Sequence, residues 1–189
     1  MGRFRVLHPA LCLCILCLSA QCLARSGSGA LEAGALSGNV AVPHGGAVLN
    51  VAHRGASGSL PEETAEAYHL AIELGADFIE CDVVLSRDLV PICRHDADLA
   101  ISTDVASRAE FAGRQRSTLI DADEGIWRRV EGYYSIDFTL AEIKTLGARQ
   151  PRRGRDTSFD GLFRVITLDE YVRIALAANR TIGIYPEVG

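Results

Sequence analysis

Phe78-Ile-Glu-Cys-Asp82 is the stretch that decides the expected fold, because it has the pattern of a buried strand ending in two carboxylates. Similar apolar runs precede two histidines: Val48-Leu-Asn-Val-Ala52 precedes His53, and Val90-Pro-Ile-Cys93 lies just before His95. A titratable group at the end of a buried strand usually lies in a pocket, because water is available only where the strand ends. In parallel α/β folds that pocket lies at the carboxyl ends of the strands. The sequence therefore predicts a parallel α/β fold with these polar groups in one site.

The order of the expected elements supports this architecture. Strands are expected over 48–52, 78–85, 90–94 and 181–187, and helices over 63–74, 140–146 and 168–178. Ser59 and Glu62 have capping-box spacing before the first helix, and Thr139 and Thr167 introduce the other two. The stretch from about 97 to 138 is too long for a plain connection, so it predicts an inserted subdomain or lid. A closed barrel needs eight strands and about 250 residues, so this pattern accounts for only part of one.

Composition excludes some classes of protein. The 189 residues are enough for one domain, and their 48% apolar content supports a hydrophobic core. The formal net charge of -5 argues against general binding to nucleic acid. Arg149 to Arg155 is the densest basic stretch, but Pro151 and Gly154 interrupt it. We therefore expect a solvated loop there.

The N-terminal residues have the layout of a targeting segment. Arg3 and Arg5 precede an apolar run over 11–18, and small residues follow, which predicts a secretory signal peptide over 1–24. The run is too short for a comfortable membrane span, although an uncleaved anchor is the alternative. Residues 25–46 are rich in Gly, Ala and Ser and predict a flexible linker. Localisation in the secretory pathway follows, and periplasm, cell wall, vacuole and medium all fit.

Four of the six cysteines lie in the expected leader, which leaves Cys81 and Cys93 in the mature chain. Side chains alternate along a strand, so Cys81 should point away from Glu80 and Asp82, towards the helices. Cys93 lies two residues before His95 and should share its inward face. The two thiols would then lie on different faces of the sheet, so we expect no disulfide.

Glu80 and Asp82 are two apart on a strand, so both carboxylates should project to one side. Like charges at that separation repel unless a proton or a cation lies between them. Oxygen ligands favour Mg²⁺ or Ca²⁺. A solvent-facing strand edge is the alternative, since this pattern also occurs by chance.

His53, His95 and Arg54 add further chemistry. Two histidines can divide proton transfer between a base and an acid, since their ordinary pKa values lie near neutrality. The guanidinium of Arg54 matches phosphate oxygens bidentately. With the carboxylate pair, these groups predict a metal-dependent phosphoesterase.

The ordered motifs resemble those of a known family. His53-Arg-Gly-Ala-Ser-Gly-x-Leu-Pro-Glu62, Gly75-Ala-Asp-Phe-Ile-Glu-x-Asp82 and His95-Asp96 are similar to the signature of glycerophosphodiester phosphodiesterases. Further similarity lies in Tyr134-Ser-Ile-Asp-Phe-Thr-Leu-x-Glu-Ile-Lys144 and Ile182-Gly-Ile-Tyr-Pro-Glu187. These segments resemble the periplasmic bacterial branch and its plant relatives, over about 48–189.

The resemblance implies a TIM (β/α)8 barrel, of which 47–189 would be the N-terminal half with the inserted subdomain. It implies that Glu80, Asp82 and Glu187 bind a divalent cation, Ca²⁺ or Mg²⁺. His53 and His95 would be the general acid/base pair, and Arg54 would bind the substrate phosphate. The reaction implied is hydrolysis of a small-molecule glycerophosphodiester to glycerol 3-phosphate and an alcohol.

Two alternatives stay open at this point. One is phospholipase D-like cleavage of a lysophospholipid or sphingolipid by the same residues. The other is an inactive, truncated fragment that acts at most as a binding module, since a half-barrel leaves strand edges unpaired. Two positions also depart from the family pattern. Gly189 stands where a lysine is frequent, and Arg94 stands where a hydrophobic residue is usual, on the expected helix-facing side.

Overall fold

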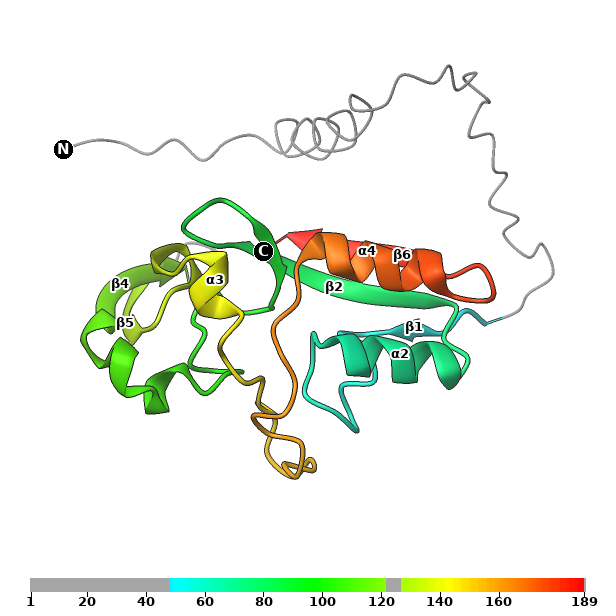
Figure 1. Ribbon diagram of the computed structural model, residues 1–189, viewed down its shortest axis with the longest axis horizontal. Coiled ribbons are helices and arrows are strands. Elements are labelled where there is room, and N and C mark those ends of the chain that lie inside the picture. The colour runs from blue at the N-terminus through cyan, green and yellow to red at the C-terminus, as the bar shows by residue number, and fades with distance from the viewer. Residues whose placement is uncertain (1–47, 122–126, 189) are drawn as a thin grey trace, which may run out of the picture. The chain divides into compact units, whose positions relative to one another are not determined.

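The computed structural model describes residues 48–121 and 127–188 (Figure 1). The expected signal peptide at 1–24 and linker at 25–46 lie outside the described residues. Among the residues that are described, no helix combines the length and the apolar character needed to cross a bilayer.

Strand β2 (Phe78–Leu85) is the centre of a four-stranded sheet. Strands β1 (Val51–Ala52) and β6 (Gly183–Val188) lie parallel to it on opposite edges. The three strands run in the same direction, as the sequence predicts, but β1 ends beside Ile79 and β2 continues past Asp82 to Leu85. Glu80 and Asp82 therefore lie within β2, whereas the sequence pattern predicted them at the end of a strand.

Strand β3 (Pro91–Cys93) contradicts the expectation of a further parallel strand, because it pairs antiparallel with β2. The physical reason is the short connection over 86–90. A parallel return needs a crossover of about a dozen residues or more, whereas a short loop closes a hairpin. His95 thus reaches the site from a chain that runs back along β2.

Helices α2 (Ala65–Glu73) and α4 (Leu168–Ala177) share a core with β2. Thr167 and Glu170 form a capping box at the start of α4, and Thr139 does the same with Glu142 for α3 (Leu140–Ile143). Buried side chains from both long helices pack against Ile79 on the apolar face of β2, and they include Tyr68, Ala71, Tyr171 and Ile174. The Tyr171 hydroxyl also donates to the carbonyl of Ile79 at 2.6 Å. This packing holds β2 rigidly beneath the site.

A second core lies under the segment between β3 and α4. Strands β4 (Arg116–Asp121) and β5 (Trp127–Gly132) form an antiparallel hairpin, preceded by the 3-10 helices η1 (Val105–Ser107) and η2 (Ala109–Arg114). A further 3-10 turn, η3 (Ser135–Asp137), leads into α3. The buried members of this core include Leu99, Val105, Phe111, Tyr133, Phe138, Ile143 and Leu146. That this segment is an insertion in a barrel stays a prediction.

Cys81 and Cys93 form a disulfide, so the expectation of two separate thiols is wrong. In the antiparallel register Cys93 lies opposite Val83, and Val83 shares a face of β2 with Cys81. The two Cα atoms are 5.8 Å apart, within the usual range for a disulfide. The expectation failed because it extended strand alternation to His95, whereas β3 ends at Cys93. A cross-link that closes so short a loop typically stabilises a fold by about 3 kcal/mol.

Candidate active site

A tight turn after β1 brings Arg54 beside Glu80 and Asp82 of β2. Arg54 and Gly55 both have positive φ values, of 61° and 78°. A Cβ atom at Gly55 would lie 2.8 Å from the backbone of Ala67, so only glycine fits there. Because the chain reverses here, the Arg54 amide donates to Glu80 Oε2 at 2.7 Å. The turn is therefore fixed by the strand that carries the carboxylates.

The Arg54 side chain is buried among acids. Its Nε lies 2.9 Å from Asp82 Oδ2, and its Nη1 lies 3.3 Å from Glu62 Oε1. Glu62 was expected to cap a helix, which is wrong: its side chain is buried and pairs with Arg54 instead. Helix α2 begins later, after Thr64, whose side chain accepts from the Ala67 amide.

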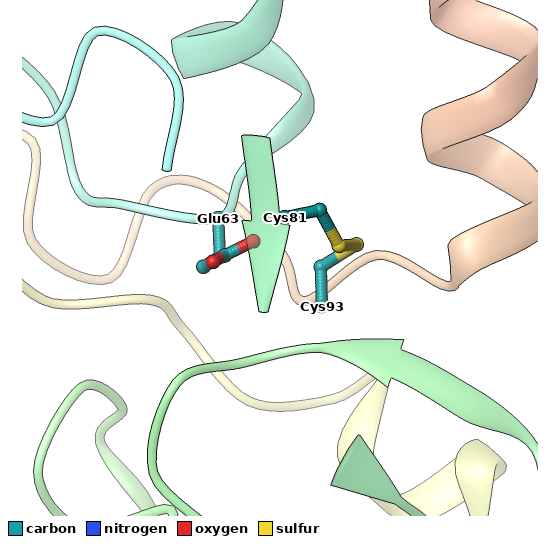
Figure 2. Close-up of side chains that lie close together, drawn as sticks. All are labelled: Glu63, Cys81 and Cys93. Carbon is teal, nitrogen blue, oxygen red and sulfur yellow. A yellow bond between two sulfur atoms is a disulfide. The ribbon is translucent and has the colours of Figure 1, made fainter. Parts of the chain in front are cut away.

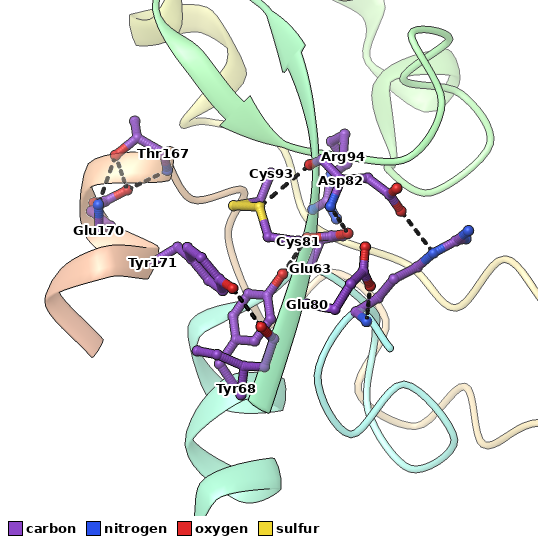
Figure 3. The surroundings of a disulfide bond; sticks show 12 residues. Glu63, Tyr68, Glu80, Cys81, Asp82, Cys93, Arg94, Thr167, Glu170 and Tyr171 are labelled. Atoms are coloured by element: carbon purple, nitrogen blue, oxygen red, sulfur yellow. Dashed lines mark hydrogen bonds and ion pairs between the residues drawn. A yellow bond between two sulfur atoms is a disulfide. The ribbon is translucent and has the colours of Figure 1, made fainter. Parts of the chain in front are cut away.

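Glu80 and Asp82 project to the same side of β2, opposite the disulfide, as Figure 3 shows. Both side chains are buried, yet Glu80 Oε1 and Asp82 Oδ2 have no hydrogen-bond donor. The short distance from Arg54 Nε to Asp82 Oδ2 is an ion pair without hydrogen-bond alignment, since neither atom is satisfied. Buried carboxylate oxygens without donors are costly unless a charge compensates them. Arg54 supplies one positive charge to both Asp82 and Glu62, and Glu80 Oε1 has no partner, so these carboxylate oxygens fit a divalent cation.

The electrostatics of these carboxylates also fit a bound cation. Burial raises the pKa of Glu80 to about 7, and the negative charges of Asp82 and Glu187 act in the same direction. The Arg54 amide and guanidinium act against the rise in this pKa. Glu187 on β6 lies opposite Asp82 in the parallel register and so shares its face of the sheet. Its side chain is exposed, unlike those of Glu80 and Asp82.

Glu63 is a buried acid beside this site, at the position where the expected helix over 63–74 would begin. Its φ of 60° lies in the left-handed region, so the helix cannot begin there. Oxygens of Glu63, Glu80 and Asp82 lie within 4.8 Å of one another. Glu63 also lies beside the disulfide, as Figure 2 shows. No periodicity in the sequence distinguishes it from its neighbour Glu62.

The Glu63 carboxylate is already supplied with partners. It accepts from the Asp82 amide at 3.0 Å and from the Tyr68 hydroxyl. Burial raises its pKa to about 8, while these hydrogen bonds and Arg94 oppose that rise. Because both oxygens have donors, we assign Glu63 a structural role, which is to hold the backbone of Asp82.

Arg94 does not face the helices, contrary to expectation. It is fully buried on the face opposite Cys93, and its Nη1 donates to the Glu62 carbonyl at 2.8 Å. Arg94 and Glu63 thus fix from below the turn that carries Glu62. Cys93 lies opposite Val83 and occupies the helix-facing position, so the next residue, Arg94, points to the other face.

His53 and His95 lie in adjacent pockets. A pocket of about 230 Å³ contains His95 and Asp96, and one of about 360 Å³ contains His53 and Ser57. Both pockets are lined by Arg54, Glu62 and Arg152. His95 Nδ1 lies 3.1 Å from Asp96 Oδ2, a contact that orients the imidazole and leaves Nε2 for a substrate. The two imidazoles therefore border a common region around Arg54.

The basic stretch 149–155 was expected to be only a solvated loop. Its Arg152 and Arg153 side chains are indeed exposed, but they also line the pockets. The Gln150 amide group donates to the carbonyls of Ser57 and Leu60 and thereby ties this loop to the turn after His53. Charge density alone could not show where the loop would lie.

Comparison with known proteins identifies the family. Residues 53–188 match the model of the glycerophosphoryl diester phosphodiesterase family, and the chain belongs to this family. It is 52% identical over 139 residues to the glycerophosphodiester phosphodiesterase GDPD6 of Arabidopsis thaliana, covering 74% of this chain and 36% of that protein.

Solved structures agree with this assignment. A glycerophosphodiester phosphodiesterase from Agrobacterium tumefaciens is 29% identical, with a TM-score of 0.53 over 75% of this chain and 47% of that structure. An Oleispira antarctica phosphodiesterase in complex with sn-glycerol-3-phosphate is 27% identical, with a TM-score of 0.52 over 75% and 44%. The chain has the mixed α/β fold of part of the family's TIM barrel. It spans about a third of that Arabidopsis relative and less than half of these two structures.

Proposed function

We propose that this chain supplies the phosphate-binding, cation-binding and proton-transfer groups for hydrolysis of glycerophosphodiesters to glycerol 3-phosphate and an alcohol. The observation that carries the proposal is the pair of buried carboxylates, Glu80 and Asp82, with oxygens that lack donors beside Arg54. Family membership supports the same chemistry. The Oleispira relative contains the corresponding product.

Each residue has a defined part in this proposal. Glu80, Asp82 and Glu187 would hold Ca²⁺ or Mg²⁺, which neutralises negative charge on the phosphate when bound. Arg54 binds a phosphate oxygen, because its guanidinium is fixed beneath the pockets by its carboxylate partners. One imidazole of the His53/His95 pair removes the proton from the attacking oxygen. The other protonates the departing alkoxide.

Other features of the chain fit this proposal. The disulfide between Cys81 and Cys93 supports an oxidising compartment, in line with the expected signal peptide and the secretory localisation. The segment 97–138, with its own core, is proposed to be an insertion in the barrel. It would begin directly after His95-Asp96 and so border the site.

The test is release of glycerol 3-phosphate from glycerophosphocholine, measured before and after chelation. We expect chelation by EDTA to abolish release, and added Ca²⁺ or Mg²⁺ to restore it. A lysophospholipid assayed in parallel separates the phospholipase D-like alternative. Full activity after exhaustive chelation would contradict the proposed cation requirement.

A further inference from the structure

The basic loop over 149–155 suggests which diesters the site prefers. Building on the proposed function, we propose that Arg152, Arg153 and Arg155 form a subsite for a second phosphate group. That group would be a phosphomonoester carried by the substrate alcohol on the His53 side of the site. The substrate class would then be glycerophosphodiesters of phosphorylated alcohols.

The position of the three arginines supports this subsite. Arg152, Arg153 and Arg155 all line the pocket that contains His53 and Arg54. Arg152 also lines the neighbouring pocket with His95. The loop that carries them connects α3 to α4 along the chain (Figure 1), and its hydrogen bonds join it to the turn before α2. A diester with its phosphate at Arg54 can place its alcohol group among these guanidinium groups, because all of them line one pocket.

The positive charge of these arginines also supports the subsite. Within the described residues, none of these three arginines forms an ion pair with a carboxylate. Glu62 is the acidic residue lining this pocket, and it is already paired with Arg54. A diester phosphate carries a single negative charge, which Arg54 and the cation of the proposed function would meet together. Arg152, Arg153 and Arg155 therefore supply more positive charge than a diester with a neutral or cationic headgroup would need.

Hydrogen bonds hold the loop that carries these arginines in place. Arg155 Nη1 donates to the Ser57 carbonyl at 2.8 Å, and the Gln150 amide nitrogen donates to the same carbonyl at 3.1 Å. The backbone amide of Gln150 donates to Asp160 at 2.8 Å. Both ends of the arginine cluster are thus fixed, while Arg152 and Arg153 keep free donors. A loop backbone that is already fixed lowers the entropy cost of placing these side chains around an anion, and guanidinium groups match phosphate oxygens bidentately.

A matched pair of substrates tests the subsite: glycerophosphoglycerol and the same diester with a terminal phosphomonoester. We expect the phosphorylated diester to bind about 10- to 100-fold more tightly, as one or two charge-assisted hydrogen bonds would give. Calorimetry in the presence of a chelator measures both dissociation constants without turnover. The ratio of kcat/KM values with a cation present provides a second readout.

Arg152→Gln/Arg153→Gln should bring both ratios close to 1. The matched control is Arg128→Gln/Arg129→Gln, which removes two exposed charges from β5, lines neither pocket and should keep the wild-type ratios. A wild-type ratio near 1, or a ratio that survives in the Arg152/Arg153 variant, overturns the subsite. A preserved binding ratio without any turnover would instead remove the proposed function and leave the subsite standing.

Discussion

His53→Ala and His95→Ala are each expected to lower kcat for release of glycerol 3-phosphate by about 100- to 10,000-fold, the usual contribution of a general acid or base. Both imidazoles border the region around Arg54, and neither side chain is buried. Their removal should therefore cost little stability while the proton-transfer step is lost. Steady-state kinetics with glycerophosphocholine, beside urea unfolding of each variant, provides the measurement.

His69→Ala is the matched control for these two substitutions. His69 is an exposed histidine on α2 and lines neither pocket. Because His69 is away from both pockets, its removal should leave kcat within about twofold of the wild type. The substitution should also change stability little, since the side chain is on the surface. If His53→Ala retained wild-type kcat, that imidazole would have no part in proton transfer.

Asp82→Asn is expected to abolish stabilisation of the protein by Ca²⁺ or Mg²⁺. A cation that binds only the folded state stabilises it by about 2.7 kcal/mol at 100 times its dissociation constant. Loss of a ligating carboxylate should weaken binding more than the about 10- to 100-fold typical of outer-shell partners. Thermal unfolding with and without each cation measures the effect independently of activity.

Asp169→Asn controls for the loss of one negative charge. Asp169 is exposed on α4, where it pairs with Arg173 at 2.7 Å. This variant should keep the full cation-dependent rise in melting temperature. An equal rise in Asp82→Asn would show that the cation binds elsewhere.

Local patterns predicted the elements that depend on neighbouring residues. The bounds of β2 were predicted as 78–85 and are observed as Phe78–Leu85. Thr139 and Thr167 begin their helices as expected, because a cap needs only a side chain and amides within one turn. Glu80 and Asp82 share a face for the same reason, since alternation along a strand is local.

Features that depend on strand direction were not predicted. The disulfide and the burial of Arg94 both follow from the antiparallel register of β3 against β2. A strand pattern has the same alternation in either direction, so it cannot reveal which one the chain takes. Connection length was the available signal, because the loop over 86–90 is too short for a parallel crossover.

The acids before α2 were also assigned wrongly, for a related reason. Ser59 and Glu62 have the spacing of a capping box, but Glu62 instead pairs with Arg54 across the turn. Glu63 adopts a left-handed backbone and points beneath Asp82. The conformations of Glu62 and Glu63 depend on partners far away in the sequence. The spacing of neighbouring residues gives no information about such partners.

Anomalous diffraction from crystals grown with Mn²⁺, which shares the oxygen preference of Ca²⁺ and Mg²⁺, tests the central claim most directly. We expect one strong peak beside the paired strands β2 and β6, coordinated by oxygens of Glu80, Asp82 and Glu187. A peak coordinated by Glu63 without Glu187, or a saturated crystal with no peak at these strands, would contradict the proposed cation centre.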